Sequence, residues 1–133
     1  MDTKVMIAFS NMICSEGVKN LLDGKAASGA DDLFSACVLM TGAGPYDMIK
    51  AFGPDVILVD LITLYNEFGE TGQAPGMRLV LLDTGCGPDV ITAAVAAKGL
   101  KGVLTGNSTP LLLKEAISAV AMGGVWFSRT APV

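Results

Sequence analysis

Short apolar runs alternate with segments of helical periodicity along the whole chain, and this order constrains the fold more than any other feature. We predict strands over residues 4–9, 34–40, 55–60, 77–82 and 102–105. We predict helices over residues 13–27 and 46–52, from Pro88 to Gly99 and from Pro110 to Gly123, and read 61–76 as a frayed helix followed by a loop. Strands that alternate with helices form βαβ units, and continuously apolar strands indicate a sheet covered on both faces. The sequence therefore predicts one α/β domain with a doubly wound, five-stranded parallel sheet.

Composition excludes several classes of function. The 133 residues include nine scattered Lys and Arg against thirteen Asp and Glu, so this segment is a poor nucleic-acid binder by itself. No apolar stretch reaches the roughly 18 residues that a membrane helix needs, and the first residues lack the apolar core of a signal peptide. We therefore expect a cytoplasmic protein without membrane contact.

Cysteine and histidine usage argues against common catalytic and metal sites. Cys14, Cys37 and Cys86 are odd in number and widely spaced, which disfavours a disulfide framework or a zinc site. The chain contains no His, the commonest general base and metal ligand. These features leave carboxylates and hydroxyls as the candidate functional groups.

Asp60 directly follows an apolar run, at the edge where function gathers in parallel α/β sheets. The stretch PDVILVDL, residues 54–61, resembles the phospho-acceptor strand of bacterial response-regulator receiver domains. The third-strand Asp of that family takes a phosphoryl group from a histidine kinase. LVLLDTG, residues 79–85, resembles the family's fourth strand. Residues 89–129 are similar to the following helix, strand and helix of its LuxR/NarL-type subgroup, and Glu16-Gly17 matches the first helix.

The resemblance implies a fold and an organisation. It implies a CheY/flavodoxin-like sheet with strand order 2-1-3-4-5 and helices on both faces. Residues 1–127 would form the receiver-like domain, and residues 128–133 would begin a linker to a helix-turn-helix domain outside this sequence. DNA would be bound only through that second domain. The receiver-like domain would be regulatory and not enzymatic, with a protein partner or a second copy of itself as its target.

The chain departs from the family pattern around Asp60. Receivers hold Mg²⁺ with an acid pair and the acceptor Asp, and they add a hydroxyl, a lysine and a switching aromatic. The positions that align with these groups are Phe9 and Ser10 (acid pair), Asp83 or, with a one-residue slip, Thr84 (hydroxyl), Gly106 (lysine) and Val103 (aromatic). Losing two carboxylates predicts that the Mg²⁺ site is lost, so we expect no cofactor. We also expect Asp83 to point a second negative charge toward Asp60, which at about 5 Å and an effective dielectric of about 20 repels by roughly 3 kcal/mol.

These departures predict an atypical receiver that acts by protein–protein interaction without the usual Mg²⁺-dependent phosphorylation. For Asp60 itself we expect a carboxylate that caps or hydrogen-bonds the following loop, or one that contacts a ligand, with a conventional phospho-acceptor as the remote alternative. The last helix carries two apolar residues beyond its inward stripe, Leu111 and Leu112, which are the candidate dimer face or a cover for the loop at the helix start.

Two other readings compete with a receiver. In the first, the residues at the strand ends form a binding site for a small ligand. The residues of this site would be Phe9, Ser10, Asp60, Asp83, Thr84 and Thr105. The stretch VLLDTGCGPD resembles the glycine-rich loop of S-adenosylmethionine-dependent methyltransferases. Too few residues follow it to supply the remaining strands of that fold, so we favour a tight turn at the start of a helix.

Overall fold

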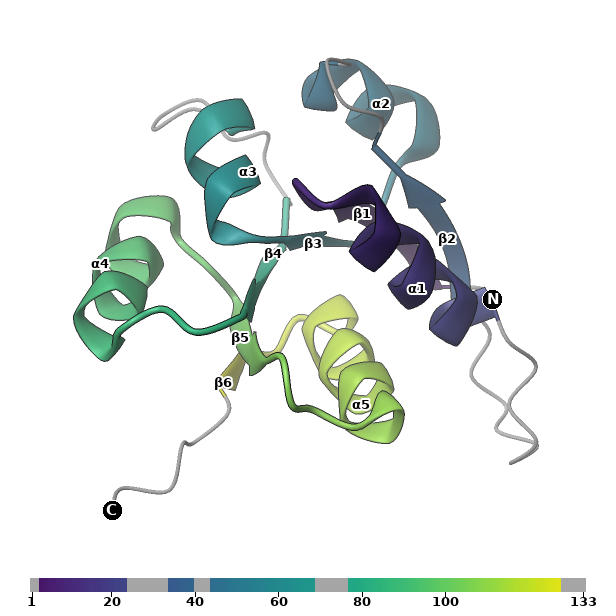
Figure 1. Cartoon of the computed structure of the whole chain (residues 1–133). Helices are drawn as coiled ribbons and strands as arrows, with labels where there is room; N and C mark the ends of the chain where they lie inside the picture. Colours follow the sequence, from purple (N-terminus) through teal and green to yellow (C-terminus); the bar gives the residue numbers. More distant parts are fainter. Residues whose placement is uncertain (1–2, 24–33, 40–43, 69–76, 128–133) are drawn as a thin grey trace.

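A six-stranded parallel sheet forms the centre of the molecule (Figure 1). The computed structural model describes residues 3–23, 34–39, 44–68 and 77–127. The strands are β1 (Thr3–Ala8), β2 (Phe34–Val38), β3 (Val56–Val59), β4 (Leu79–Asp83), β5 (Gly102–Thr105) and β6 (Trp126–Phe127). The helices are α1 (Met12–Asp23), α2 (Pro45–Phe52), α3 (Leu61–Glu67), α4 (Pro88–Lys98) and α5 (Pro110–Ala121). The strand order is β2-β1-β3-β4-β5-β6.

The predicted α/β fold and the order of the first five strands are confirmed, but the predicted number of strands is wrong. After α5, Gly123 takes a positive φ of 97° and the chain turns back along β5. Trp126 and Phe127 then pair in parallel with Gly102 and Val103. A Cβ at Gly102 would lie 2.8 Å from the carbonyl oxygen of Trp126, so only glycine admits this sixth strand so closely.

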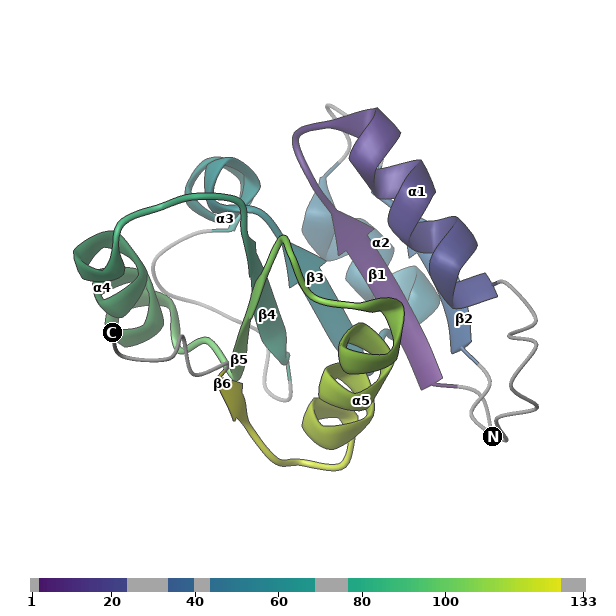
Figure 2. The ribbon, with the colours of Figure 1, turned by 60° about the horizontal axis from the view of Figure 1, so that its bottom comes forward.

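The helices cover the two faces of the sheet, as predicted. α1 and α5 pack on one face, around Val5, Ile7, Leu58, Val80 and Leu104. α2, α3 and α4 pack on the other, around Met6, Ile57, Val59, Leu81 and Val103. Figure 2 shows α1 and α5 on the same side of the strands, with α3 and α4 away from them.

Local signals start and stop several helices. Pro45, Pro88 and Pro110 stand in the first turns of α2, α4 and α5, where a missing N–H costs nothing. Gly53 and Gly99 end α2 and α4 in the left-handed conformation. These helices therefore begin just beyond the carboxyl ends of the strands, where the candidate site residues lie.

Some predicted segments differ from the observed elements. Residues 61–67 form a regular helix rather than a frayed one, because the Asp60 side chain caps it. The ends of the predicted helix 13–27 and strand 34–40 fall outside the described residues, as does the predicted linker at 128–133. Among the residues that the structure describes, none of the helices combines the length and the apolar character needed to cross a bilayer.

Candidate functional site

Asp60 joins the ends of β1 and β3. Its Oδ2 accepts hydrogen bonds from the backbone N–H of Ser10 at 2.8 Å and from the Ser10 hydroxyl at 2.5 Å. Its Oδ1 accepts a third from the backbone N–H of Thr63 at 2.9 Å, which makes Asp60 the N-cap of α3. Both carboxylate oxygens are therefore engaged by the chain's own donors.

These contacts favour the ionised form of Asp60. Partial burial raises the pKa of the carboxyl, but the hydrogen bonds from Ser10 and Thr63 outweigh it, so the pKa lies below its ordinary value. Asp60 is consequently a carboxylate at neutral pH, and its charge is stabilised by neutral donors.

A pocket of about 440 Å³ surrounds this carboxylate, and we call it the Asp60 pocket. Its lining residues are Phe9, Ser10, Asn11, Cys14, Asp60, Leu61, Ile62, Leu82, Thr84 and Cys86. The structure thus brings together four residues predicted for this edge: Phe9, Ser10, Asp60 and Thr84. None of the lining residues is a lysine or arginine, so the pocket offers no side-chain cation to an anionic group.

Asp83 is not placed as expected. Its Oδ1 accepts hydrogen bonds from the backbone N–H groups of Gly85 (3.0 Å) and Cys86 (2.7 Å), and it lines a different pocket, beside α4. Side chains alternate along a strand, so Asp83 follows Leu81 to the α4 face of the sheet. Thr84 instead lines the Asp60 pocket. The structure therefore does not place Asp83 in the Asp60 pocket, whereas Thr84, the one-residue alternative, lines it. Which of the two corresponds to the family's hydroxyl stays a prediction.

The aligned lysine and aromatic positions also have clear places in the structure. Gly106 donates its backbone N–H to the Asp83 carbonyl oxygen at 2.7 Å, just beyond β5. The nearest lysine in that part of the sequence, Lys101, precedes β5 and so lies at the opposite end of the strand. Val103 is buried on the α4 face.

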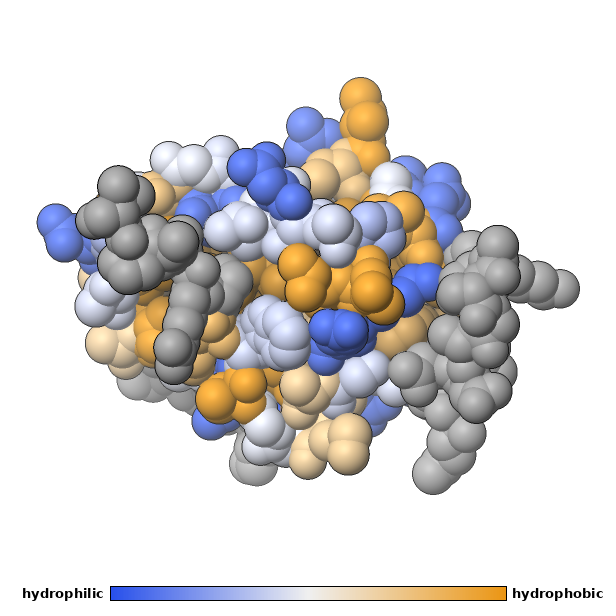
Figure 3. Space-filling model, turned by 90° about the horizontal axis from the view of Figure 1, so that it is seen from below, coloured by the Kyte–Doolittle hydropathy of each residue, from blue (hydrophilic) through white to orange (hydrophobic). Residues whose placement is uncertain are grey.

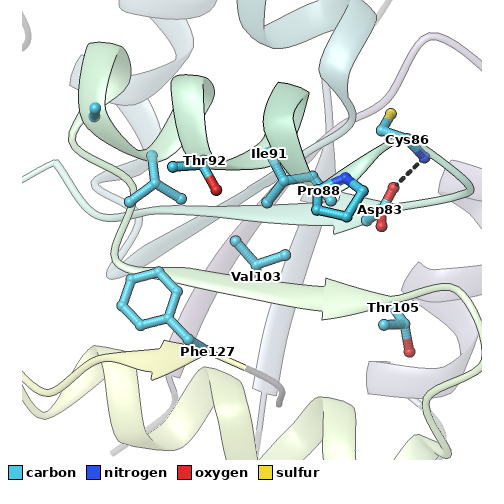
Figure 4. Close-up of a pocket in the computed structure, with 10 residues that line it drawn as sticks. Asp83, Cys86, Pro88, Ile91, Thr92, Val103, Thr105 and Phe127 are labelled. Carbon is cyan, nitrogen blue, oxygen red and sulfur yellow. Dashed lines mark hydrogen bonds between the residues drawn. The ribbon is translucent and has the colours of Figure 1, made fainter. Parts of the chain in front are cut away.

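The second pocket, which we call the α4 pocket, measures about 500 Å³ (Figure 4). Its lining residues are Asp83, Cys86, Pro88, Ile91, Thr92, Val95, Ala96, Val103, Thr105 and Phe127. Of these, Asp83, Val103 and Thr105 were expected near the strand ends. We did not predict from the sequence that α4 and Phe127 would line a pocket. Two features of the sequence could have indicated it: the valine at position 103 and the aromatic pair that follows Gly123-Gly124.

The candidate dimer face is exposed. Leu111 and Leu112, in the first turn of α5, are 66% and 40% exposed. Figure 3 looks from below Figure 1, toward the α5 side, and shows hydrophobic side chains interspersed with hydrophilic ones. Self-association through these residues stays a prediction.

Within the described parts of the chain, no group of three or more His, Cys, Asp or Glu side chains is placed to hold a metal ion. The Asp60 pocket contributes one carboxylate, Asp60 itself, with Ser10, Asn11 and Thr84 as neutral oxygen donors. Mg²⁺ favours several hard oxygen ligands, usually with one or two carboxylates among them. This donor set is poor for Mg²⁺.

Comparison with known proteins gives a consistent answer at the level of fold. No family model matches the sequence, and no curated protein matches it significantly. Among solved structures, the isolated REC domain of RcsB from Salmonella enterica serovar Typhimurium superposes with a TM-score of 0.71 at 14% identity. The match covers 96% of this chain and 94% of the RcsB chain. This chain has the fold of a receiver domain.

Other neighbours carry the same description. A LuxR-family DNA-binding response regulator from Silicibacter pomeroyi has a TM-score of 0.68 at 23% identity, with 98% of this chain and 99% of that chain covered. The signal receiver domain of the response regulator NarL from Mycobacterium tuberculosis has a TM-score of 0.64 at 24% identity, with 92% and 98% covered. The predicted resemblance to LuxR/NarL-type receivers is confirmed as a likeness of fold. Asp60 directly follows the third strand of this receiver fold.

Proposed function

We propose that this receiver-fold domain is a regulatory, non-enzymatic module that acts by protein–protein interaction without Mg²⁺-dependent phosphorylation of Asp60. One observation carries the proposal. The Asp60 carboxylate is held by the hydroxyl and N–H of Ser10, one of the two positions that align with the acid pair of a receiver cation site. The other position is Phe9, an apolar side chain that is only 5% exposed.

Charge explains why this substitution matters. A transferring phosphoryl group carries negative charge on several oxygens, and a cation must neutralise it as it approaches an ionised acceptor. One opposite charge at about 4 Å contributes about 4 kcal/mol at an effective dielectric of about 20. Losing it from the transition state slows the reaction by about a thousandfold. The Asp60 pocket has no lysine or arginine among its lining residues and no second carboxylate for Mg²⁺.

In this proposal Asp60 has a structural role. Its three hydrogen bonds cap α3 and fix the loop between β1 and α1. These bonds hold the ends of β1 and β3 in one conformation, which suits a surface that a partner protein recognises. We propose Leu111 and Leu112 as part of that surface, for a second copy or for another protein, because both leucines are exposed.

The setting follows from the likeness to LuxR-family regulators. We propose that the domain works in the cytoplasm as part of a transcription regulator. DNA binding would be supplied by a separate helix-turn-helix domain. The net charge of −4 fits a domain that does not itself contact DNA.

Incubation with Mg²⁺ and acetyl phosphate, followed by intact mass spectrometry, tests the proposal. We expect no added phosphoryl group on the wild-type chain, and no change in its amide NMR spectrum with Mg²⁺ and beryllofluoride. Stoichiometric modification that disappears in Asp60→Asn would overturn the proposal and establish a conventional phospho-acceptor.

Ligand sensing is a second candidate function, and one observation favours it. The α4 pocket is large enough for a small organic molecule and combines apolar walls with a few polar groups. Its occupant would contact neither Asp60 nor Ser10, because neither residue lines this pocket.

A further inference from the structure

We propose that the α4 pocket binds a small amphipathic organic cation, with its apolar body along α4 and its ammonium group at Asp83. This site deepens the second candidate function. It does not require Asp60 to be phosphorylated or unphosphorylated, because Asp60 does not line the α4 pocket, although the two pockets share Cys86.

The shape of the α4 pocket suits a small ligand. Its volume of about 500 Å³ lies within the range of known ligand sites, which is about 300 to 1,000 Å³. Figure 4 shows Ile91 of α4 on one side of the pocket and Val103 and Phe127 on the other. Val95 and Ala96 of α4 also line it. The space between them exists partly because residue 103 is a valine rather than a large side chain.

The polar end of the pocket selects for positive charge. Asp83 and Thr105 lie together at one end, away from Phe127 (Figure 4). Oδ1 of Asp83 is fixed by the N–H groups of Gly85 and Cys86. The Cys86 thiol, which also lines the pocket, is a further hydrogen-bond partner of this carboxylate. In the described part of the chain, no lysine or arginine forms a salt bridge with Asp83.

A fixed carboxylate at the end of an apolar cavity complements an ammonium group. No lysine or arginine lines the pocket, and the whole chain has a net charge of −4, so an anionic ligand would be repelled. A neutral molecule of the same shape would gain the apolar contacts but not the charge. Charge complementarity therefore points to a primary amine on an aryl or alkyl body.

Because of the position of Phe127, a ligand in the α4 pocket would affect the edge strand of the sheet. Phe127 belongs to β6, the short edge strand that pairs with β5. A ligand packed against its ring would restrain β6. Trp126, the single tryptophan of the chain, is the adjacent residue and reports on this strand.

Titration of the whole chain with 3-phenylpropylamine, followed by amide NMR and Trp126 fluorescence, tests the proposal. The neutral isostere 3-phenylpropan-1-ol and the anion 3-phenylpropanoate serve as matched probes. We expect shifts at Thr92, Val103, Thr105 and Phe127, with the amine bound about fivefold more tightly than the alcohol, as fits a partly exposed ion pair, and with no binding of the anion. If no probe binds at millimolar concentration, or if the anion binds best, the proposal is wrong.

Variants distinguish the contribution of the Asp83 charge to binding from the contribution of the apolar cavity. Asp83→Asn should remove the preference for the amine and leave alcohol binding intact. Ala96→Phe, at an exposed position on the rim, should block all probes without filling the buried core. The control Glu115→Gln removes an exposed negative charge from α5, on the other face of the sheet, and should change nothing. An amine preference that survives in Asp83→Asn, or probe binding that survives in Ala96→Phe, would contradict the assignment. Neither result would alter the outcome of the phosphorylation test at Asp60.

Discussion

Replacing Asp60 by alanine should destabilise the domain. The sign of the change in the free energy of unfolding tests whether Asp60 is a hydrogen-bonded cap or part of a cation site. The substitution removes the N-cap of α3, a loss of about 1 kcal/mol. It also leaves the N–H and hydroxyl of Ser10 without their acceptor, which adds about 1 kcal/mol for partly exposed groups. The expected total is a decrease of about 2 kcal/mol in the free energy of unfolding, or roughly 8 °C in Tm for a domain of this size.

A cation site made of several carboxylates would respond in the opposite direction. Like charges that crowd together in the absence of metal destabilise the folded state, and removing one of them relieves the repulsion. The Asp60 pocket holds a single carboxylate among neutral donors, so there is no repulsion to relieve.

Urea unfolding at pH 7, without divalent ions, measures the difference. Glu115→Gln is the control, because Glu115 is exposed on α5 and its change should stay within about 0.5 kcal/mol. Asp60→Asn should lose less stability than Asp60→Ala, since the amide oxygen still accepts one hydrogen bond. Equal or greater stability of Asp60→Ala would refute the account of Asp60 as a satisfied cap.

Three further substitutions test other contacts. Gly102→Ala should displace β6, because the new Cβ would lie 2.8 Å from a backbone oxygen, and the emission of Trp126 should then shift to the red; an unchanged spectrum would contradict the close approach. Lys98 is only 2% exposed and donates to the carbonyl oxygen of the residue after α3 at 3.0 Å. Lys98→Met keeps the apolar stem but leaves that oxygen without its donor, so the urea midpoint should fall by the equivalent of about 1 kcal/mol, and an unchanged midpoint would show the bond to be dispensable. Ser10→Ala removes a hydrogen bond that lowers the pKa of Asp60, so this pKa should rise in a carbon-13 NMR titration. The stability that the low pKa provides is fully present above the unfolded pKa and is lost as pH falls through the folded pKa. In Ser10→Ala this loss should therefore be smaller and should be complete at a higher pH.

Most of the sheet could be predicted because its signals are local. Continuous apolar runs define β1, β3 and β4, and proline in the first turn marks the start of α4 and α5. β6 could not be predicted in the same way. A strand of two residues has no alternation to detect, and it exists only because Gly102 lets another backbone approach.

The helix after Asp60, α3, could not be predicted as a regular helix for a different reason. Its cap uses the Asp60 side chain and the N–H of Thr63, but position 63 holds Thr where a capping box would have Glu or Gln. The helix has only seven residues, too few for a clear apolar period. Its regularity therefore depends on packing as well as on the Asp60 cap, with Leu64 and the following Phe68 both fully buried.

Asp60 lies at the strand ends as expected, whereas Asp83 faces a different pocket than expected, and both outcomes have one reason. Parallel pairing places all strand ends at one edge, so the sequence can assign residues to that edge. It cannot assign them to a face where the strand ends, because a shift of one residue moves a side chain to the opposite face. Asp83 thus lies beside α4, and Thr84 lines the Asp60 pocket.

The position of Asp83 bears on the proposal that Asp60 is not phosphorylated. Because Asp83 lines the α4 pocket and not the Asp60 pocket, the proposal attributes the missing phosphorylation to the lack of positive charge alone. Phe9→Asp and Ser10→Asp would supply the missing carboxylates for Mg²⁺, and Gly106→Lys would supply a cation. Position 106 tolerates a side chain narrowly, since its Cβ would lie 3.4 Å from the Asp83 carbonyl oxygen. The triple variant should accept a phosphoryl group from acetyl phosphate with Asp83 unchanged. If it is modified only after Asp83→Asn is added, then the carboxylate beside α4 does oppose the reaction, and the separation of the two pockets does not isolate Asp60.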